Sequence, residues 1–109
     1  MDDIELKLIG GALGAEVQGI DLTGDTGAST YKTIRELLVK HEVLFFRDQD
    51  VSPAQQHALA SSFGPLQSHP AYATVENFPE ITILESTAEN PSKIECWHSD
   101  MTFRAHPPL

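Results

Sequence analysis

The chain is 109 residues long and acidic, with 7 Lys and Arg side chains against 16 Asp and Glu and a formal net charge of −9. Because such a chain repels phosphates and anionic lipid headgroups, neither nucleic acid nor a membrane is expected as a partner. No apolar run is long enough to cross a bilayer and no basic start precedes an apolar block, so we expect a cytoplasmic protein.

The length permits at most one small domain, and the sequence shows no internal repeat, linker or second domain. The single cysteine, Cys96, excludes an internal disulfide and any site built from a pair of cysteines. We therefore expect one α+β unit over 1–109.

The first part of the chain predicts two short strands and a helix. Ile4, Leu6 and Leu8 alternate with charged residues, which is the pattern of a half-buried strand, and a second short strand is expected over 15–18. Ser29 can cap a helix that follows. The apolar positions of this helix fall three and four residues apart, as one helix face requires: Tyr31, Ile34, Leu37 and Leu38.

The middle of the chain predicts a buried strand and then a second helix. The apolar run 43–46 is too short for a helix, so we expect a strand that is buried on both faces at the centre of the core. Ser52, Pro53 and Gln55 form a capping box with a proline in the first turn, which starts a helix. The Gly-Pro pair 64–65 would stop this helix.

The last part of the chain predicts loops and two further strands. We expect a loop over 65–79, a strand over 81–84 and a turn within 88–92, because the loop stretches are rich in Pro, Ser and Asn. A final strand would include Trp97, and Trp97 and Phe103 would lie in the core on either side of it.

The segment Trp97-His98-Ser99-Asp100 is the most informative stretch of the sequence. On an extended strand the side chains alternate between faces, so His98 and Asp100 would point to the same side. An imidazole and a carboxylate placed in this way are two of the three ligands of a 2-His-1-carboxylate site for non-haem Fe(II). The spacing alone leaves an ordinary surface hydrogen bond between the two side chains as the alternative.

The surrounding residues resemble a known family. Residues 97–103 read W-H-S-D-M-T-F and, with the prolines 107–108, are similar to the iron-site segment of the taurine/α-ketoglutarate dioxygenase family (TauD/TfdA). The stretch 14–22 is similar to the opening segment of that family, 43–49 to its first buried strand, and 60–72 to the helix end and loop before the metal strand. The resemblance extends over nearly the whole chain.

This resemblance implies a fold, a chemistry and cofactors. The chain would hold the amino-terminal strands and helices of a double-stranded β-helix of the jelly-roll, clavaminate synthase-like kind, truncated before most of the barrel. The enzyme would be an Fe(II)- and α-ketoglutarate-dependent dioxygenase that uses oxygen to hydroxylate a small sulfonate or alkyl sulfate in sulfur metabolism, and the full-length protein could form a homo-oligomer. The resemblance implies His98 and Asp100 as metal ligands, and His69 and Tyr72 as donors to the anionic head group of the substrate.

One position departs from the family's pattern. Taurine-type members have an asparagine four residues before the metal histidine, where it binds the amine of taurine, and this chain has Ile94 there. An apolar side chain cannot accept a hydrogen bond from an ammonium group. A longer or less polar sulfonate, or an alkyl sulfate, would therefore suit this chain better than taurine.

The resemblance also implies what the chain lacks. The third ligand of the family, a histidine, and the arginine that pairs with α-ketoglutarate lie further along its members, so no residue here is assigned to the co-substrate. We expect the chain to be the amino-terminal part of a single dioxygenase domain and to be inactive alone, because two protein ligands hold iron weakly. The alternative is a stand-alone, non-catalytic α+β binding or interaction module derived from the same fold.

Overall fold

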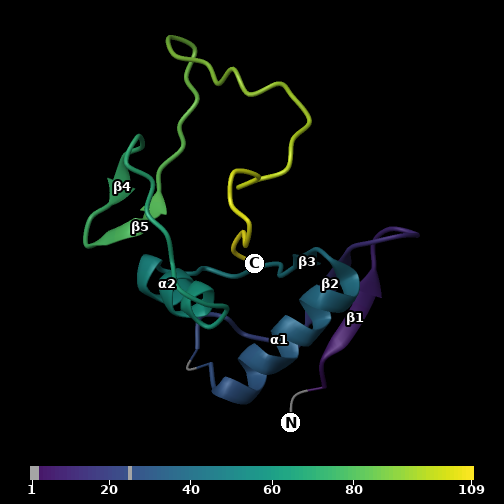
Figure 1. Cartoon of the computed structure of the whole chain (residues 1–109). Helices are drawn as coiled ribbons and strands as arrows, with labels where there is room; N and C mark the ends of the chain where they lie inside the picture. Colours follow the sequence, from purple (N-terminus) through teal and green to yellow (C-terminus); the bar gives the residue numbers. More distant parts are fainter. Residues whose placement is uncertain (1–2, 25) are drawn as a thin grey trace.

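The computed structural model describes residues 3–24 and 26–109. Within these ranges the chain forms two helices and five short strands, which make a three-stranded sheet and a separate two-stranded hairpin (Figure 1). The mixture of helices and strands agrees with the expected α+β composition. In the described ranges, no helix has the length and apolar character needed to cross a membrane.

The three-stranded sheet has β2 at its centre. β1 (Glu5–Leu8) pairs antiparallel with β2 (Ala15–Gln18), and β2 pairs in parallel with β3 (Leu44–Phe45). The strands predicted for the first part of the chain are thus confirmed. Ala15 and Val17 are buried on the same face because alternate residues of a strand share a side.

The expected half-burial of β1 is wrong. Leu6 lies opposite Val17 and Leu8 opposite Ala15, yet these leucines remain 41% and 65% exposed. The buried cluster centres on Val17, Ile20 and Ile34, away from this edge strand, so the apolar side chains of β1 are left uncovered.

Helix α1 (Ala28–His41) packs on the inner face of the sheet through Ile34, which is 3% exposed. The predicted helix is confirmed, but Ser29 does not cap it. The cap residue is Gly27, whose carbonyl accepts hydrogen bonds from the amides of Thr30 and Tyr31 at 3.1 and 3.2 Å. The helix therefore begins before Ser29, and the backbone of Gly27 replaces the expected side-chain cap.

The strand predicted over 43–46 is shorter and less buried than expected. β3 contains two residues and lies at the edge of the sheet. Leu44 and Phe46 pack against the core cluster, whereas Val43 and Phe45 are 41% and 37% exposed. Because helices cover one face of this sheet only, alternate residues of the apolar run point away from the core.

Helix α2 (Pro53–Ser61) begins with the predicted capping box. The Ser52 hydroxyl accepts a hydrogen bond from the Gln55 amide at 3.3 Å, and the Gln55 side chain accepts one from the Ser52 amide at 2.8 Å. The Gln55 side-chain amide also donates to the carbonyl of Thr23. Leu59 and Phe63 pack against the core cluster, so α2 is held by Thr23 near its start and by the core near its end.

A hairpin lies where a loop was expected. β4 (Thr74–Val75) pairs antiparallel with β5 (Phe78–Thr82), so the loop expected over 65–79 and the strand expected over 81–84 both have wrong limits. The turn between the strands contains Asn77 at φ 64°. Asparagine tolerates this left-handed conformation, which tight hairpin turns require.

Residues 83–109 form no helix or strand, so the final strand predicted around Trp97 is absent. Figure 1 shows this segment rising from β5 in a wide arc and returning toward α2 and β3. In this structure its backbone has no neighbouring strand with which to pair, and a strand is stable only when its backbone groups are paired. Trp97 and Phe103, expected in the core, are 104% and 79% exposed.

Candidate metal centre and substrate pocket

His98 and Asp100 meet, although the strand that was expected to align them is not formed. The Nε2 atom of His98 lies 3.1 Å from Oδ1 of Asp100. A turn follows directly, with Met101 at φ 55° and the Arg104 amide donating to the Met101 carbonyl at 3.0 Å. The pair lies on an exposed loop, with the side chains 57% and 89% exposed.

The other ring nitrogen of His98 is held by the backbone. Nδ1 lies 2.9 Å from the carbonyl oxygen of Cys96, which accepts a hydrogen bond only if Nδ1 carries the proton. A neutral imidazole then has its lone pair on Nε2, the atom that faces the carboxylate of Asp100. Metal-bound histidines are commonly oriented in this way, with the distal N–H bonded to a carbonyl or a carboxylate.

The charge state of His98 reflects the same two contacts. The hydrogen bond to the Cys96 carbonyl and, after it, the negative charge of Asp100 raise the pKa of the imidazole above its ordinary value. Two acceptor atoms 3.1 Å apart repel each other unless a positive charge lies between them. The pair is therefore suited to a proton or a metal cation, and imidazole with carboxylate is a donor set that suits Fe(II).

A third ligand is not supplied by the chain as described. In residues 3–24 and 26–109, no three His, Cys, Asp or Glu side chains come together in a way that could hold a metal ion. The thiol of Cys96 is exposed, and its contact with His98 is through its backbone carbonyl.

His69 and Tyr72 form a second pair. Their ring centroids lie 4.8 Å apart with an interplanar angle of 49°. The Ala71 amide donates to Nδ1 of His69 at 3.2 Å, which leaves Nε2 of that ring as the nitrogen that carries a proton in the neutral form. The hydroxyl of Tyr72 and this N–H are both donors, as an anionic head group would require.

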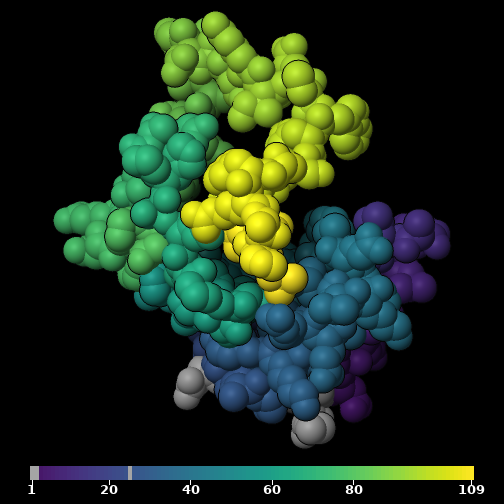
Figure 2. Space-filling view, in the orientation of Figure 1, coloured from purple at the N-terminus to yellow at the C-terminus, as the bar shows by residue number. Residues whose placement is uncertain are grey.

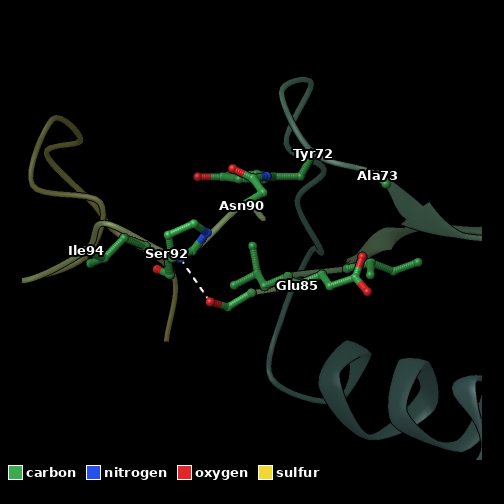
Figure 3. Close-up of a pocket in the computed structure, with 10 residues that line it drawn as sticks. Tyr72, Ala73, Glu85, Asn90, Ser92 and Ile94 are labelled. Atoms are coloured by element: carbon green, nitrogen blue, oxygen red, sulfur yellow. Dashed lines mark hydrogen bonds between the residues drawn. The ribbon is translucent and has the colours of Figure 1, made fainter. Parts of the chain in front are cut away.

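Tyr72 also lines a cavity of about 440 Å³ (Figure 3). One side of the cavity comes from the residues that flank the hairpin, and the other from the loop that follows it. In Figure 3 the Tyr72 side chain extends over the cavity beside Asn90, with Ser92 and Ile94 further along the loop. The full lining is Tyr72, Ala73, Ile83, Leu84, Glu85, Ser86, Asn90, Pro91, Ser92 and Ile94.

The far side of the cavity is shaped by hydrogen bonds within the loop. The Ser92 amide donates to the Ser86 hydroxyl at 2.9 Å, and the Asn90 amide donates to the Thr87 hydroxyl at 2.9 Å. Sequence reasoning expected a turn at these residues but missed their part in a pocket. The available signal was the closely spaced Ser, Thr and Asn side chains, which bond readily to nearby backbone.

The structure thus brings some of the candidate residues together but not all of them. It brings His98 to Asp100, His69 to Tyr72, and Tyr72 and Ile94 to one cavity. His98 and Asp100 do not line that cavity, so the metal pair and the pocket are separate features of this structure.

Comparison with known proteins identifies the family. Residues 5–109 match the family described as taurine catabolism dioxygenase TauD, TfdA. Because this match covers nearly the whole chain, the chain belongs to the TauD/TfdA family.

Two curated relatives are similar over most of the chain. The alkylsulfatase of Acinetobacter baylyi is 33% identical over 101 residues, and the α-ketoglutarate-dependent sulfate ester dioxygenase of Pseudomonas putida is 30% identical over 102 residues. These matches cover 92% and 93% of this chain but 31% and 33% of the relatives. The chain therefore spans about a third of the length of the curated relatives it matches.

Solved structures agree with the family. A taurine dioxygenase from Burkholderia xenovorans matches with a TM-score of 0.63 and 35% identity, over 70% of this chain and 28% of that one. The structure of AAD-2 in complex with Mn(II) and N-oxalylglycine matches with a TM-score of 0.56 and 28% identity, over 59% of this chain and 25% of that one.

Proposed function

We propose that the chain is the amino-terminal part of an Fe(II)- and α-ketoglutarate-dependent dioxygenase that hydroxylates a small sulfonate or alkyl sulfate. The observation that carries the proposal is the approach of His98 Nε2 to Asp100 Oδ1 at 3.1 Å, within a segment that belongs to the TauD/TfdA family. The double-stranded β-helix of the complete domain is part of the same proposal.

In this proposal His98 and Asp100 supply two of the three iron ligands. The Cys96 carbonyl holds the imidazole with Nε2 toward Asp100, so both side chains could hold a metal, and Asp100 would offset part of its charge. The iron, when bound with α-ketoglutarate, supplies the activation of oxygen that no amino-acid side chain provides. The third ligand and the partner of the α-ketoglutarate carboxylate would come from the rest of the domain.

His69 and Tyr72 would bind the anionic head group of the substrate. Both present hydrogen-bond donors, and Tyr72 reaches into the 440 Å³ cavity. The apolar residues Ile83, Leu84 and Ile94 line the same cavity and would contact an alkyl chain. The names of the two curated relatives, an alkylsulfatase and a sulfate ester dioxygenase, support an alkyl sulfate over taurine.

The 109 residues alone are expected to be inactive, because two ligands hold iron weakly and no co-substrate site is assigned within them. The intact mass of the protein made in its native host tests this point. A mass well above the 12.0 kDa of this chain supports a longer dioxygenase, whereas a mass near it supports a stand-alone binding module.

The metal chemistry is tested in the longer protein. Anaerobic addition of Fe(II) and α-ketoglutarate should give a visible metal-to-ligand charge-transfer band, and His98→Ala should abolish the band. His106→Ala is the matched control, since His106 is an exposed histidine of the same segment and is not assigned to the site. A band of full intensity in His98→Ala would contradict the proposal.

The substrate assignment is tested by Ile94→Asn in the longer protein. An asparagine there restores an acceptor for an ammonium group, and a hydrogen bond to a charged group contributes about 1.5–3 kcal/mol. The ratio of kcat/KM for taurine to kcat/KM for hexyl sulfate should therefore rise by about tenfold or more. Ile94→Val, which keeps the site apolar, should leave this ratio nearly unchanged. An unchanged ratio in Ile94→Asn would show that this position does not contact the substrate.

A further inference from the structure

His57 of α2 joins the helix to the hairpin. Its Nε2 atom lies 3.5 Å from Oε2 of Glu80, and its ring centroid lies 5.6 Å from that of Phe78 at a tilt of 54°. Phe78 and Glu80 are two apart on β5, so they share the face of the strand that meets the helix. One imidazole therefore makes both a polar and an aromatic contact with the hairpin.

This contact is partly shielded from solvent. The side chains of His57 and Glu80 are 35% and 30% exposed, much less than those of the pair between Lys32 and Glu36 on α1, at 79% and 66%. Polar contacts that are partly buried are screened less by water and salt than exposed ones. With His57 protonated, its contact with Glu80 is therefore screened less than the exposed pair of Lys32 and Glu36 is.

The helix and the hairpin are held in place differently. α2 is held against the rest of the chain by the bond from Gln55 to the Thr23 carbonyl and by Leu59, which packs against the core cluster. The hairpin, by contrast, lies apart from the three-stranded sheet and packs on α2 through β5 (Figure 1). The position of the hairpin is therefore set largely by what it contacts on α2.

The hairpin carries one side of the cavity. Tyr72 and Ala73 directly precede β4, and Ile83 and Leu84 directly follow β5. The Ile83 amide donates to the Ala73 carbonyl at 2.8 Å, which extends the pairing of the hairpin to the cavity wall. A shift of β5 on α2 would move all four lining residues together.

We propose that His57 is a positioning residue for the substrate pocket, which it orients by fixing β5 to α2 through Glu80 and Phe78. His57 does not line the cavity, so it acts through the hairpin and not on the substrate. This inference rests on the proposed function, because it takes the cavity to be a substrate site. The coupling of His57 to the cavity residues, however, can be measured without any substrate.

The coupling is tested by amide NMR spectra of the 109-residue chain. His57→Ala should shift the amides of Tyr72, Ala73, Ile83 and Leu84. His57→Arg should restore these shifts, because a guanidinium pairs with a carboxylate and stacks on an aromatic ring. Gln56→Ala, at an exposed neighbouring position of the same helix, is the matched control and should leave them unchanged.

The effect on binding is measured by titrating hexyl sulfate into the same variants. His57→Ala should weaken binding by about three- to tenfold, since the loosened wall must be ordered again on binding, and His57→Arg should recover most of the affinity. Glu80→Gln, which leaves the aromatic contact in place, should give a smaller loss and serves if His57→Ala does not fold.

Two results would overturn the inference. The first is that the amide resonances of the cavity residues do not shift in His57→Ala or Glu80→Gln. The second is that His57→Ala weakens binding and His57→Arg fails to restore the affinity. If the amides move and recover as expected while the unmodified chain does not bind hexyl sulfate, the positioning role is supported, and the assignment of this cavity as an alkyl sulfate site is contradicted.

Discussion

His98 Nε2 and Asp100 Oδ1 face each other at 3.1 Å, and the proposed metal chemistry rests on this pair. The Cys96 carbonyl fixes the proton on Nδ1, so the space between Nε2 and the carboxylate favours a positive charge. At the proposed metal site, a proton and a metal ion would compete for that space. Metal affinity should accordingly rise with pH as the imidazole loses its proton.

The pKa of His98 gives a direct prediction. The Cys96 carbonyl is the larger cause of its raised pKa and Asp100 the second, so Asp100→Asn should lower the pKa but leave it above the ordinary value for histidine. Because the folded-state pKa is raised, the contact stabilises the folded segment below the ordinary pKa and loses this effect as the pH rises through the raised value. Ring ¹⁵N shifts followed over a pH titration measure both. An unchanged pKa in Asp100→Asn would show that the two side chains do not interact in solution.

At the scale of single residues, the pairing of His98 with Asp100 was predicted from the alternation of a strand that is not formed. The two side chains meet instead on a loop that turns at Met101. The sequence did not reveal that the Cys96 carbonyl orients the ring, because every residue has a backbone carbonyl and the residue types do not show which one is used. The assignments of His98, Asp100, His69 and Tyr72 to metal and substrate remain predictions.

Among the elements, helix α2 shows how a local signal decides a structure. Ser52→Ala removes the hydroxyl that accepts from the Gln55 amide and should lower the free energy of unfolding by about 1 kcal/mol. Ser29→Ala on α1 is the matched control, because Ser29 does not cap that helix and alanine has the higher helix propensity. Urea denaturation of both variants measures the difference. Equal losses in the two would contradict the assignment of the caps.

Elements set by neighbouring residues could be predicted, and elements set by distant partners could not. The capping box at Ser52 and the apolar spacing around Ile34 are local, and both helices formed where expected. The burial of the run 43–46 depends on what covers its second face, and the strand around Trp97 depends on a neighbouring strand. The hairpin at Asn77 was missed although its turn residue was visible, because the surrounding Pro and Ser favoured a loop.

For the molecule as a whole, large apolar side chains are exposed along much of the described chain, and the most exposed of them, Trp97 and Phe103, lie in its last third. Leu84, Ile94 and Trp97 are 70%, 69% and 104% exposed, and Figure 2 shows their segment forming a lobe of its own above the sheet and helices. Contiguous exposed apolar surface commonly marks a site that binds protein, membrane or ligand. The proposal that the remainder of a dioxygenase domain covers them accounts for this exposure.

The exposed apolar surface should be detectable in solution. The 109-residue chain is expected to bind the dye ANS with a rise in fluorescence, and replacing both Trp97 and Phe103 by serine should reduce that rise. Replacing the exposed polar residues Ser92 and Thr102 by alanine is the control for substitution within the same segment. A chain that gives no dye signal would contradict the exposure of these side chains.

The central claim is that His98 and Asp100 hold a metal ion, and Mn(II) titration of the 109-residue chain followed by NMR tests it most directly. Carboxylate and imidazole ligands suit Mn(II), and the related AAD-2 is known in complex with it. The account predicts that paramagnetic broadening begins at the amides of Trp97 to Asp100, that His98→Ala and Asp100→Asn each remove it, and that His106→Ala does not. Broadening that persists in both His98→Ala and Asp100→Asn, or that begins elsewhere in the chain, would contradict the account.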